Sequence, residues 1–165
     1  MPRTAPFERH TDRYEAWFEG HEAAYESELA ALRQLRPDPG FGLEIGVGTG
    51  RFAGRLGYEV GLDPAGAMLD RARERGITAV RGVAEALPFH DDCFDSALMV
   101  TTVCFVDDLE VAFSEAYRVL RDGGALVLGY IDRESPVGQR YLDRQDENPF
   151  YRDATFVSSA QLRSC

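Results

Sequence analysis

The stretch GLEIGVGTGRF, residues 42–52, constrains the fold more than any other part of the sequence. It places three glycines at alternate positions, Gly46, Gly48 and Gly50, directly after a short apolar run that carries one carboxylate, Glu44. An apolar strand followed by a glycine turn and a helix is typical of open α/β sheets, where the ligand lies outside the carboxyl ends of the strands. Glycine suits such a turn because it tolerates positive φ and has no Cβ to keep a ligand away. The stretch therefore predicts a ligand-binding turn at one end of a sheet.

Strand and helix patterns alternate along the rest of the chain. Short apolar runs predict strands, and apolar side chains at three- and four-residue spacing predict helices. The expected strands cover residues 43–47, 59–63, 77–80, 94–100 and 125–131, and the expected helices cover residues 51–56, 65–75 and 109–120. This alternation predicts the α/β class, with a Rossmann-like, doubly wound and mostly parallel sheet that has helices on both faces.

The chain is expected to form one domain, because its 165 residues fall within the usual size of about 100 to 200 residues. Residues 14–35 space aromatic and apolar side chains along one face of an amphipathic helix, so residues 1–38 are expected to form a helical lid. Residues 41–131 would form the binding core. The polar tail, residues 132–165, predicts near its end the first turn of a helix capped by Ser158 or Ser159.

Composition argues against several classes of protein. The chain has 28 acidic and 18 basic residues and no basic block of the kind that neutralises nucleic-acid phosphates, so a small-molecule partner is the better expectation. No window approaches the roughly 18 consecutive apolar residues of a membrane span, and the charged N-terminus lacks the apolar centre of a secretory signal. A cytoplasmic protein is therefore expected. Cys93, Cys104 and Cys165 are odd in number and lack CxxC spacing, which argues against disulfides and thiolate zinc sites.

Two features narrow the range of ligands that the glycine turn is expected to bind. The dinucleotide fingerprint GxGxxG needs a third glycine where this chain has Arg51, and the spacing here is GxGxG instead. Asp63 ends the next predicted strand, 19 residues after Glu44, and is placed to accept hydrogen bonds from a ribose diol. An acid at this position binds the ribose of NAD and of other adenosine-containing ligands alike. These residues therefore predict a ligand that contains adenosine, but not which one.

Four motifs in order carry a closer resemblance. LEIGVGTGRF, GLDPAGAML, RGVAEALPFHDDCFDSALMV and YRVLRDGGALVLGY resemble the class I S-adenosylmethionine-dependent methyltransferases, and among them the type 11 domains that include ubiquinone and menaquinone C-methyltransferases. The resemblance implies S-adenosylmethionine as cofactor, S-adenosylhomocysteine as product, and methyl transfer to a small-molecule acceptor. The family's sheet normally ends in an antiparallel hairpin after the helix near Ser158, which this chain, ending at Cys165, lacks. The resemblance thus suggests either a truncated form or a homodimer in which a partner covers the last strand.

The resemblance also assigns cofactor-binding positions. The glycine turn would lie under the methionine part, with Glu44 orienting the turn and the ammonium end, and Asp63 would bind the ribose. The full set that it implies is Glu44, Gly46, Gly48, Gly50, Asp63, Pro64, Met68, Ala84, Glu85 and Thr101. One departure concerns the adenine: the family commonly has Asp directly before Ala84, whereas this chain has Val83. Adenine recognition is then expected to depend on backbone groups or on Glu85.

Acceptor-binding residues are expected in the lid and in the loop after the fourth strand. The candidates are Tyr14, Trp17, His21, Tyr25, Cys104 and Phe105, with ordinary core or surface packing as the alternative. No catalytic residue is assigned, because a sulfonium is already a good leaving group and orientation can supply about 7 to 11 kcal/mol of the barrier reduction. A general base is a hypothesis that concerns only Tyr14 and His21. No metal is expected, since Asp132 and Glu134 read as a charged loop.

Two other functions stay open at this stage. One is a module that holds the cofactor without catalysis, as in a regulatory or assembly subunit. The other is an NAD-dependent oxidoreductase, which Arg51 at the third glycine position disfavours.

Overall fold

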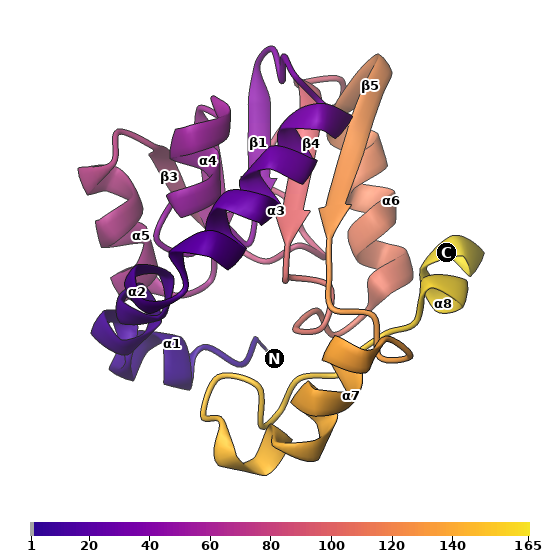
Figure 1. The fold of residues 1–165 in the computed structure, drawn as a ribbon. Coiled ribbons are helices and arrows are strands. Elements are labelled where there is room, and N and C mark those ends of the chain that lie inside the picture. The colour runs from indigo at the N-terminus through magenta and orange to yellow at the C-terminus, as the bar shows by residue number, and fades with distance from the viewer. Residues whose placement is uncertain (1) are drawn as a thin grey trace.

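The computed structural model describes residues 2–165, which are built around a five-stranded sheet in the order β3-β2-β1-β4-β5 (Figure 1). The strands are β1 (Gly42–Ile45), β2 (Val60–Asp63), β3 (Thr78–Arg81), β4 (Phe94–Val100) and β5 (Leu120–Gly129). Every neighbouring pair is parallel, and Leu43 of β1 lies opposite Val60 of β2 and Ala97 of β4. The structure confirms the predicted Rossmann-like α/β fold.

Helices cover both faces of the sheet, as the alternation predicted. One face packs against α3 (Glu22–Leu35), α4 (Arg51–Leu56) and α5 (Gly66–Glu74), and the other packs against α6 (Leu109–Val119). In Figure 1, α3 crosses in front of the sheet and α6 lies behind it. The side chains of β4 alternate accordingly, because Leu98 packs on the α3 side whereas Ala97 and Met99 pack on the α6 side.

The N-terminal region differs from the single helix predicted over residues 14–35. It consists of α1 (Ala5–Arg9), α2 (Thr11–Gly20) and α3, and His21 at the junction of α2 and α3 has non-helical backbone angles, φ −130° and ψ 43°. Gly20 is a poor helix former, so the break falls where helix propensity is lowest. The break lets α3 lie along the sheet while α1 and α2 turn toward the carboxyl ends of its strands (Figure 1).

The tail contains more structure than its polarity predicted. It forms α7 (Pro136–Asp143), a 3-10 turn (Gln145–Glu147) and α8 (Ser159–Ser164). Ser135 caps α7 by accepting a hydrogen bond from the Gly138 N–H at 2.9 Å. Of the two predicted caps for α8, Ser158 is the one used, in a reciprocal capping box with Gln161. The expected last strand also begins earlier, at Leu120, directly after α6 ends.

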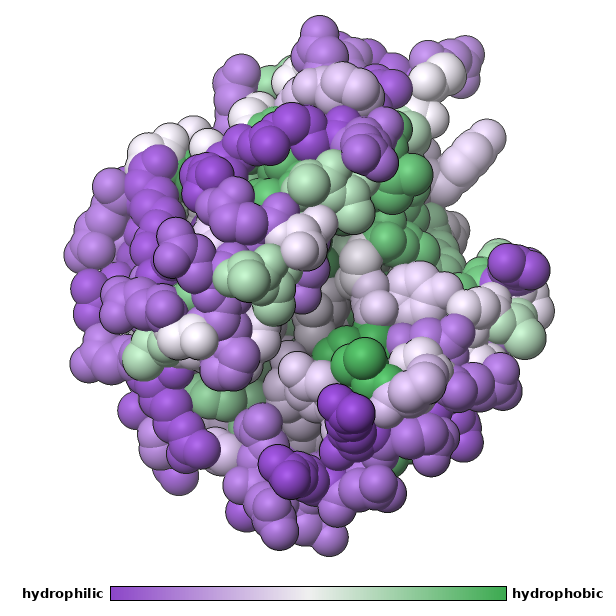
Figure 2. All heavy atoms as spheres, in the orientation of Figure 1, coloured by the Kyte–Doolittle hydropathy of each residue, from purple (hydrophilic) through white to green (hydrophobic). Residues whose placement is uncertain are grey.

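The elements that converge on the carboxyl ends of the strands come from both ends of the chain. In Figure 1 the strand arrows point toward α1, α2 and α7, and the N-terminus lies between these helices. The space-filling view is hollowed in the same region, and the outer side of α1 and α2 is mainly hydrophilic (Figure 2). Within residues 2–165, each helix is too short or too polar to span a bilayer.

Candidate functional site

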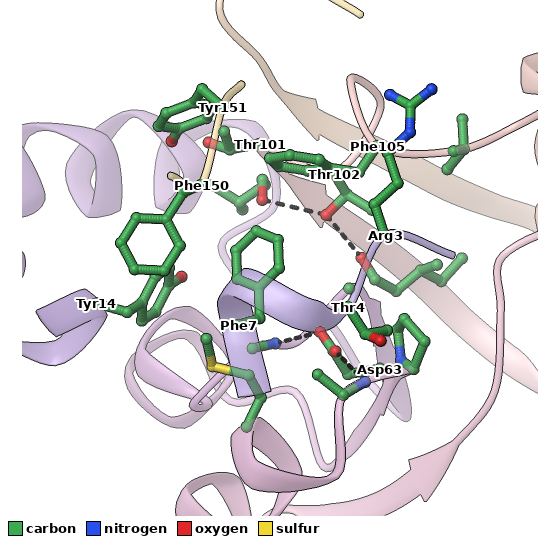
Figure 3. Close-up of a pocket in the computed structure, with 18 of the residues that line it drawn as sticks. Arg3, Thr4, Phe7, Tyr14, Asp63, Thr101, Thr102, Phe105, Phe150 and Tyr151 are labelled. Carbon is green, nitrogen blue, oxygen red and sulfur yellow. Dashed lines mark hydrogen bonds between the residues drawn. The ribbon is translucent and has the colours of Figure 1, made fainter. Parts of the chain in front are cut away.

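A cavity of about 670 Å³ lies at the carboxyl ends of the strands, between the N-terminal helices and the tail. Most of the predicted positions line it (Figure 3). From the cofactor set these are Gly46, Gly48, Asp63, Pro64, Met68, Ala84, Glu85 and Thr101, and from the acceptor set they are Tyr14, Trp17 and Phe105. The cavity therefore joins residues expected to bind the two reactants in one space.

The glycine turn needs its glycines for both backbone angle and space. Gly46, Gly48 and Gly50 have positive φ values of 76°, 55° and 82°. A Cβ at Gly46 would lie 2.3 Å from the Thr102 hydroxyl oxygen, and one at Gly48 would lie 3.2 Å from the Tyr14 hydroxyl oxygen. Gly50 does not line the cavity but packs closely against α5 and Ile77, so it supports the turn from behind. Because glycine has no side chain, the backbone of the turn stays accessible from the cavity.

Glu44 lies beneath the turn and outside the cavity lining. Its side chain is 1% exposed, and it accepts a hydrogen bond at 2.9 Å from the Ala53 N–H in the first turn of α4. Burial raises the pKa of Glu44 well above its ordinary value, and the nearby charge of Asp63 raises it further. Glu44 thus holds the first turn of α4, directly after the glycine turn, and does not line the cavity.

Asp63 ends β2 and lines the cavity. One carboxylate oxygen accepts from the Ala65 N–H at 2.9 Å, and the other accepts from the Gly48 N–H at 3.0 Å (Figure 3). Burial raises the pKa of Asp63 to about 6, against the lowering effect of these two bonds. Each oxygen keeps a second lone pair, so the carboxylate that fixes the glycine turn can also accept hydrogen bonds from a ribose diol.

Apolar side chains line the part of the cavity where the sequence predicted an adenine site. Met68 and Ala84 are buried, and Val83 lines the cavity at the position where the resemblance would place Asp. The Glu85 carboxylate accepts hydrogen bonds from the Asp107 N–H at 2.6 Å and the Asp108 N–H at 3.3 Å. It therefore holds the loop that leads into α6 as well as lining the cavity.

The loop after β4 is held in an unusual backbone conformation. Thr101 has a positive φ of 54°, which is rare outside glycine, and its N–H donates to Gly129 O at 2.7 Å. The Thr102 hydroxyl lies 3.2 Å from both Ile45 O and Val100 O. Thr102 was missed by sequence reasoning, because nothing in its neighbourhood distinguishes it from a loop threonine.

Several aromatic side chains also line the cavity. Phe7 of α1 points toward Phe105 and Phe150, with ring centroids 5.2 and 5.4 Å away (Figure 3). Phe7, Tyr141, Phe150 and Tyr151 were not predicted as site residues, although all four line the cavity. Their local sequences, APFERH, RYLDR and NPFYRD, are polar and carry no binding motif. Only the fold of the tail brings them to the lid.

Three of the predicted acceptor residues do not line the cavity. His21 is exposed at the break between α2 and α3, where its ring stacks on Trp17 at 4.5 Å. The hydroxyl of Tyr25 donates to Arg51 O, and its ring packs on Phe18 and Phe52. His21 thus lies at the helix break, Tyr25 packs into the core, and neither reaches the cavity.

Cys104, the third, is buried against Ala154 and Phe156 of the tail. Burial raises the pKa of its thiol to about 12, so it behaves as an apolar group and not as a nucleophile at neutral pH. Burial also raises the pKa of Tyr14 far above neutral, with the charges of Glu44 and Asp63 adding to the effect. Tyr14 is therefore a hydrogen-bond donor to the cavity and a poor general base.

Asp132, in the charged loop after β5, links two segments of the tail by hydrogen bonds. Its carboxylate accepts hydrogen bonds from the Ser159 hydroxyl and from the Glu134 N–H at 2.9 Å. The hydrogen bond from Ser159 lowers the pKa of Asp132, and that from the Glu134 N–H lowers it further. Its structural role is to tie the start of α7 to the start of α8.

Comparisons with known proteins agree with this geometry. The family described as "Methyltransferase domain" (Methyltransf_11) matches residues 43–128. An uncharacterized protein of Methanocaldococcus jannaschii is 39% identical over 94% of this chain and 76% of its own length. A ubiquinone/menaquinone biosynthesis C-methyltransferase of Allorhizobium ampelinum is 34% identical over 76% of this chain. The match spans 55% of that enzyme, so just over half of its length has a counterpart here.

Among solved structures, a protein of Thermotoga maritima superposes with a TM-score of 0.93 and 48% identity, covering 98% of this chain and 77% of the other. It is described as an S-adenosylmethionine-dependent methyltransferase and possible histamine N-methyltransferase. The family match covers the strands and turns that build the cavity, and these relatives share most of the chain. The chain therefore belongs to the class I S-adenosylmethionine-dependent methyltransferases, with S-adenosyl-L-methionine as cofactor.

Proposed function

We propose that the protein transfers a methyl group from S-adenosylmethionine to a small-molecule acceptor, and that both bind in the cavity beneath a lid formed by α1 and α2. One observation carries the proposal: a single cavity of about 670 Å³ is lined at once by the glycine turn, by Asp63 and by a wall of aromatic side chains. Small-molecule sites usually have volumes of about 300 to 1,000 Å³ and bury most of their ligand. An acceptor enclosed in such a space must itself be small.

The residues present fit the cofactor. We assign the methionine part to the turn at Gly46 and Gly48, the ribose to Asp63, and the adenine to the apolar surface of Met68 and Ala84. Pro64, Glu85 and Thr101 complete this wall. Bound S-adenosylmethionine supplies a methyl group on a positively charged sulfur that leaves readily as a thioether.

The chain's own contribution is then to orient the acceptor and to exclude water. The lid is held for this purpose by Phe7, which packs on Phe105 of the loop after β4 and on Phe150 of the tail. These contacts close the cavity on the side away from the sheet.

The alternative of a non-catalytic cofactor-binding module is less well supported. A module that only holds the cofactor would not need the aromatic wall that Tyr141, Phe150 and Tyr151 of the tail add beyond the cofactor-facing residues. The descriptions of the Thermotoga and Allorhizobium proteins, which name histamine and ubiquinone or menaquinone biosynthesis, also favour a small acceptor.

A transfer experiment tests the proposal. The protein is incubated with methyl-labelled S-adenosylmethionine and a cell extract separated into small-molecule, protein and nucleic-acid fractions. We expect label in the small-molecule fraction with the wild type and none with Asp63→Ala. Label in protein or nucleic acid would contradict the proposal, and cofactor binding without transfer to any fraction would favour the non-catalytic module.

A further inference from the structure

Glu28 of α3 is a carboxylate that lines the cavity and that the assignments above do not use. It lies one turn after Ala24, which lines the same space, because residues four apart share one face of a helix. The next residue, Leu29, faces the core and is fully buried. The helix thus presents Glu28 to the cavity from a rigid element packed on the sheet.

Glu28 differs from the other cavity carboxylates in having no partner. Asp63 accepts two backbone hydrogen bonds, and Glu85 accepts hydrogen bonds from the N–H groups at the start of α6. Within residues 2–165, Glu28 makes neither a hydrogen bond nor an ion pair, and no arginine contributes to the shift of its pKa. Burial alone raises that pKa above its ordinary value. An unpaired carboxylate in such surroundings is stabilised by any ligand that brings a positive charge or hydrogen-bond donors.

Three tyrosines of the cavity lining interact electrostatically with Glu28. Burial raises the pKa of Tyr14, Tyr141 and Tyr151, and the negative charge of Glu28 adds to the shift of each phenol. The carboxylate is therefore close to rings from α2, α7 and the tail, all of which line the cavity. The faces of aromatic rings attract cations, and a carboxylate beside them completes a site for a positively charged nitrogen.

We propose that Glu28 and the rings of Tyr14, Tyr141 and Tyr151 bind the basic nitrogen of the acceptor, so that the substrate is an amine with an apolar or aromatic body. This inference rests on the proposed function, since it names the substrate class of the same cavity. The carboxylate accepts N–H hydrogen bonds from the nitrogen, while the aromatic wall takes up the rest of the molecule.

The same carboxylate suits the chemistry that an amine requires. A protonated amine has no lone pair, so it must lose one proton before its nitrogen can attack a methyl carbon. Glu28 accepts that proton, and its raised pKa makes it a better proton acceptor than a glutamate with an ordinary pKa. The nitrogen lone pair then forms the N–C bond as the S–C bond breaks, and the electrons of the broken bond remain on sulfur. The proton on Glu28 passes to solvent.

Calorimetric titration of the whole protein in saturating S-adenosylhomocysteine tests the inference without turnover. The probes are benzylamine, 2-phenylethylamine and 3-phenylpropylamine, each compared with the alcohol that replaces its amino group by a hydroxyl. The variants are Glu28→Gln and, as a matched control on the same helix, Glu22→Gln, which is exposed and outside the cavity. We expect at least one amine to bind more tightly than its alcohol to the wild type and to Glu22→Gln. In Glu28→Gln we expect its affinity to fall about 10-fold to 100-fold, with the alcohol unchanged.

The outcomes separate this inference from the proposed function. Equal affinity for every amine and its alcohol in the wild type, or equal amine affinity in Glu28→Gln and the wild type, would overturn the role of Glu28. Retained S-adenosylhomocysteine binding in those experiments would leave the proposed function standing. Failure of the wild type to bind S-adenosylhomocysteine would instead count against the proposed function itself. Thermal unfolding of Glu28→Gln checks that the variant is folded.

Discussion

The carboxylate of Glu8 in α1 accepts a hydrogen bond at 2.7 Å from the Gly66 N–H, the first amide of α5. It accepts a second at 3.0 Å from the Ala67 N–H. An acid at a helix N-terminus satisfies amides that have no partner within the helix and interacts favourably with the helix dipole. Here the acid comes from 58 residues away, so capping α5 also fixes the position of the lid over the cavity.

Removing this cap is expected to loosen the lid. Glu8→Ala should lower the free energy of unfolding by about 1 kcal/mol, because two helix amides lose their acceptor. Hydrogen exchange of the amides in α1 and α2 should become faster, and S-adenosylhomocysteine should dissociate faster.

Asp12→Asn is a matched control on the same lid. Asp12 contacts Arg71 at 2.8 Å, but its side chain is 90% exposed, and such exposed pairs contribute little. If both variants change the hydrogen-exchange rates of α1 and α2 equally, the hydrogen bonds that Glu8 accepts from α5 are not what holds the lid.

The ion pairs of Glu15 should stabilise the protein at neutral pH and lose this effect in acid. Its carboxylate contacts Arg51 at 2.9 Å and Arg75 at 2.6 Å and is only 16% exposed. Although burial raises the pKa of Glu15, the hydrogen bonds from Arg51 and Arg75 lower it below its ordinary value of 4.5. A lowered pKa stabilises the folded protein at neutral pH, and this contribution is lost as the pH falls below about 4.5.

Urea unfolding of the wild type and Glu15→Gln at several pH values measures this contribution. The wild type should be more stable by about 1 to 3 kcal/mol at pH 7, and the difference should shrink on acidification. A difference that stays constant from neutral to acid pH would contradict the assignment.

Asp63 should make cofactor affinity depend on pH. Its pKa of about 6 means that the carboxylate, which we propose accepts hydrogen bonds from both ribose hydroxyls, is the dominant form above that pH. Affinity for S-adenosylhomocysteine should be constant at higher pH and weaken toward 10-fold per unit as the pH falls below about 6. Calorimetry on Asp63→Asn, which cannot titrate at this position, should give weaker binding with this dependence removed.

The raised pKa of Asp63 has the opposite effect on the stability of the ligand-free protein, which should decrease as the pH rises. The folded form holds the Asp63 proton more tightly than the unfolded chain does. Its contribution to stability should therefore fall as the pH rises from about 4 to about 6. If the difference in the free energy of unfolding between the wild type and Asp63→Asn stays constant over that interval, the pKa of Asp63 is not raised.

Two Gly→Ala changes that are chemically identical should have opposite effects. At Gly48, with φ 55°, an added Cβ is strained and lies 3.2 Å from the Tyr14 hydroxyl oxygen, so Gly48→Ala should lose about 1 to 2 kcal/mol of stability and most cofactor affinity. Gly54 lies in the middle of α4 with open space around it, and Gly54→Ala should gain up to about 1 kcal/mol. Equal effects of the two changes on cofactor binding would show that the turn is not shaped for a ligand.

The sequence predicted the sheet and many residues that line the cavity, for physical reasons. Residues 97–100, at the end of β4, form a continuous apolar run because the strand packs against helices on both faces, and the glycines at 46 and 48 mark a turn where a side chain would be strained. Asp63 could be found because it sits at a fixed place, the end of the strand that follows the turn.

The other half of the site depends on long-range packing that local patterns do not encode. The pattern over residues 14–35 continues through the break at His21, so His21 and Tyr25 were expected in the acceptor site with Trp17, but neither lines the cavity. Phe150 and Tyr151 reach the cavity only because α7 folds the polar tail back beneath the strands. Glu28 was missed because a charged residue on an amphipathic helix ordinarily faces solvent.

The most direct test of the account is calorimetric titration of S-adenosylmethionine, S-adenosylhomocysteine and NAD into the wild type and Asp63→Ala. We predict that the first two bind the wild type, that NAD does not, and that binding is lost or strongly weakened in the variant. Binding of NAD in place of S-adenosylmethionine, or equal binding of S-adenosylmethionine to both proteins, would contradict the assignment of the cavity to this cofactor.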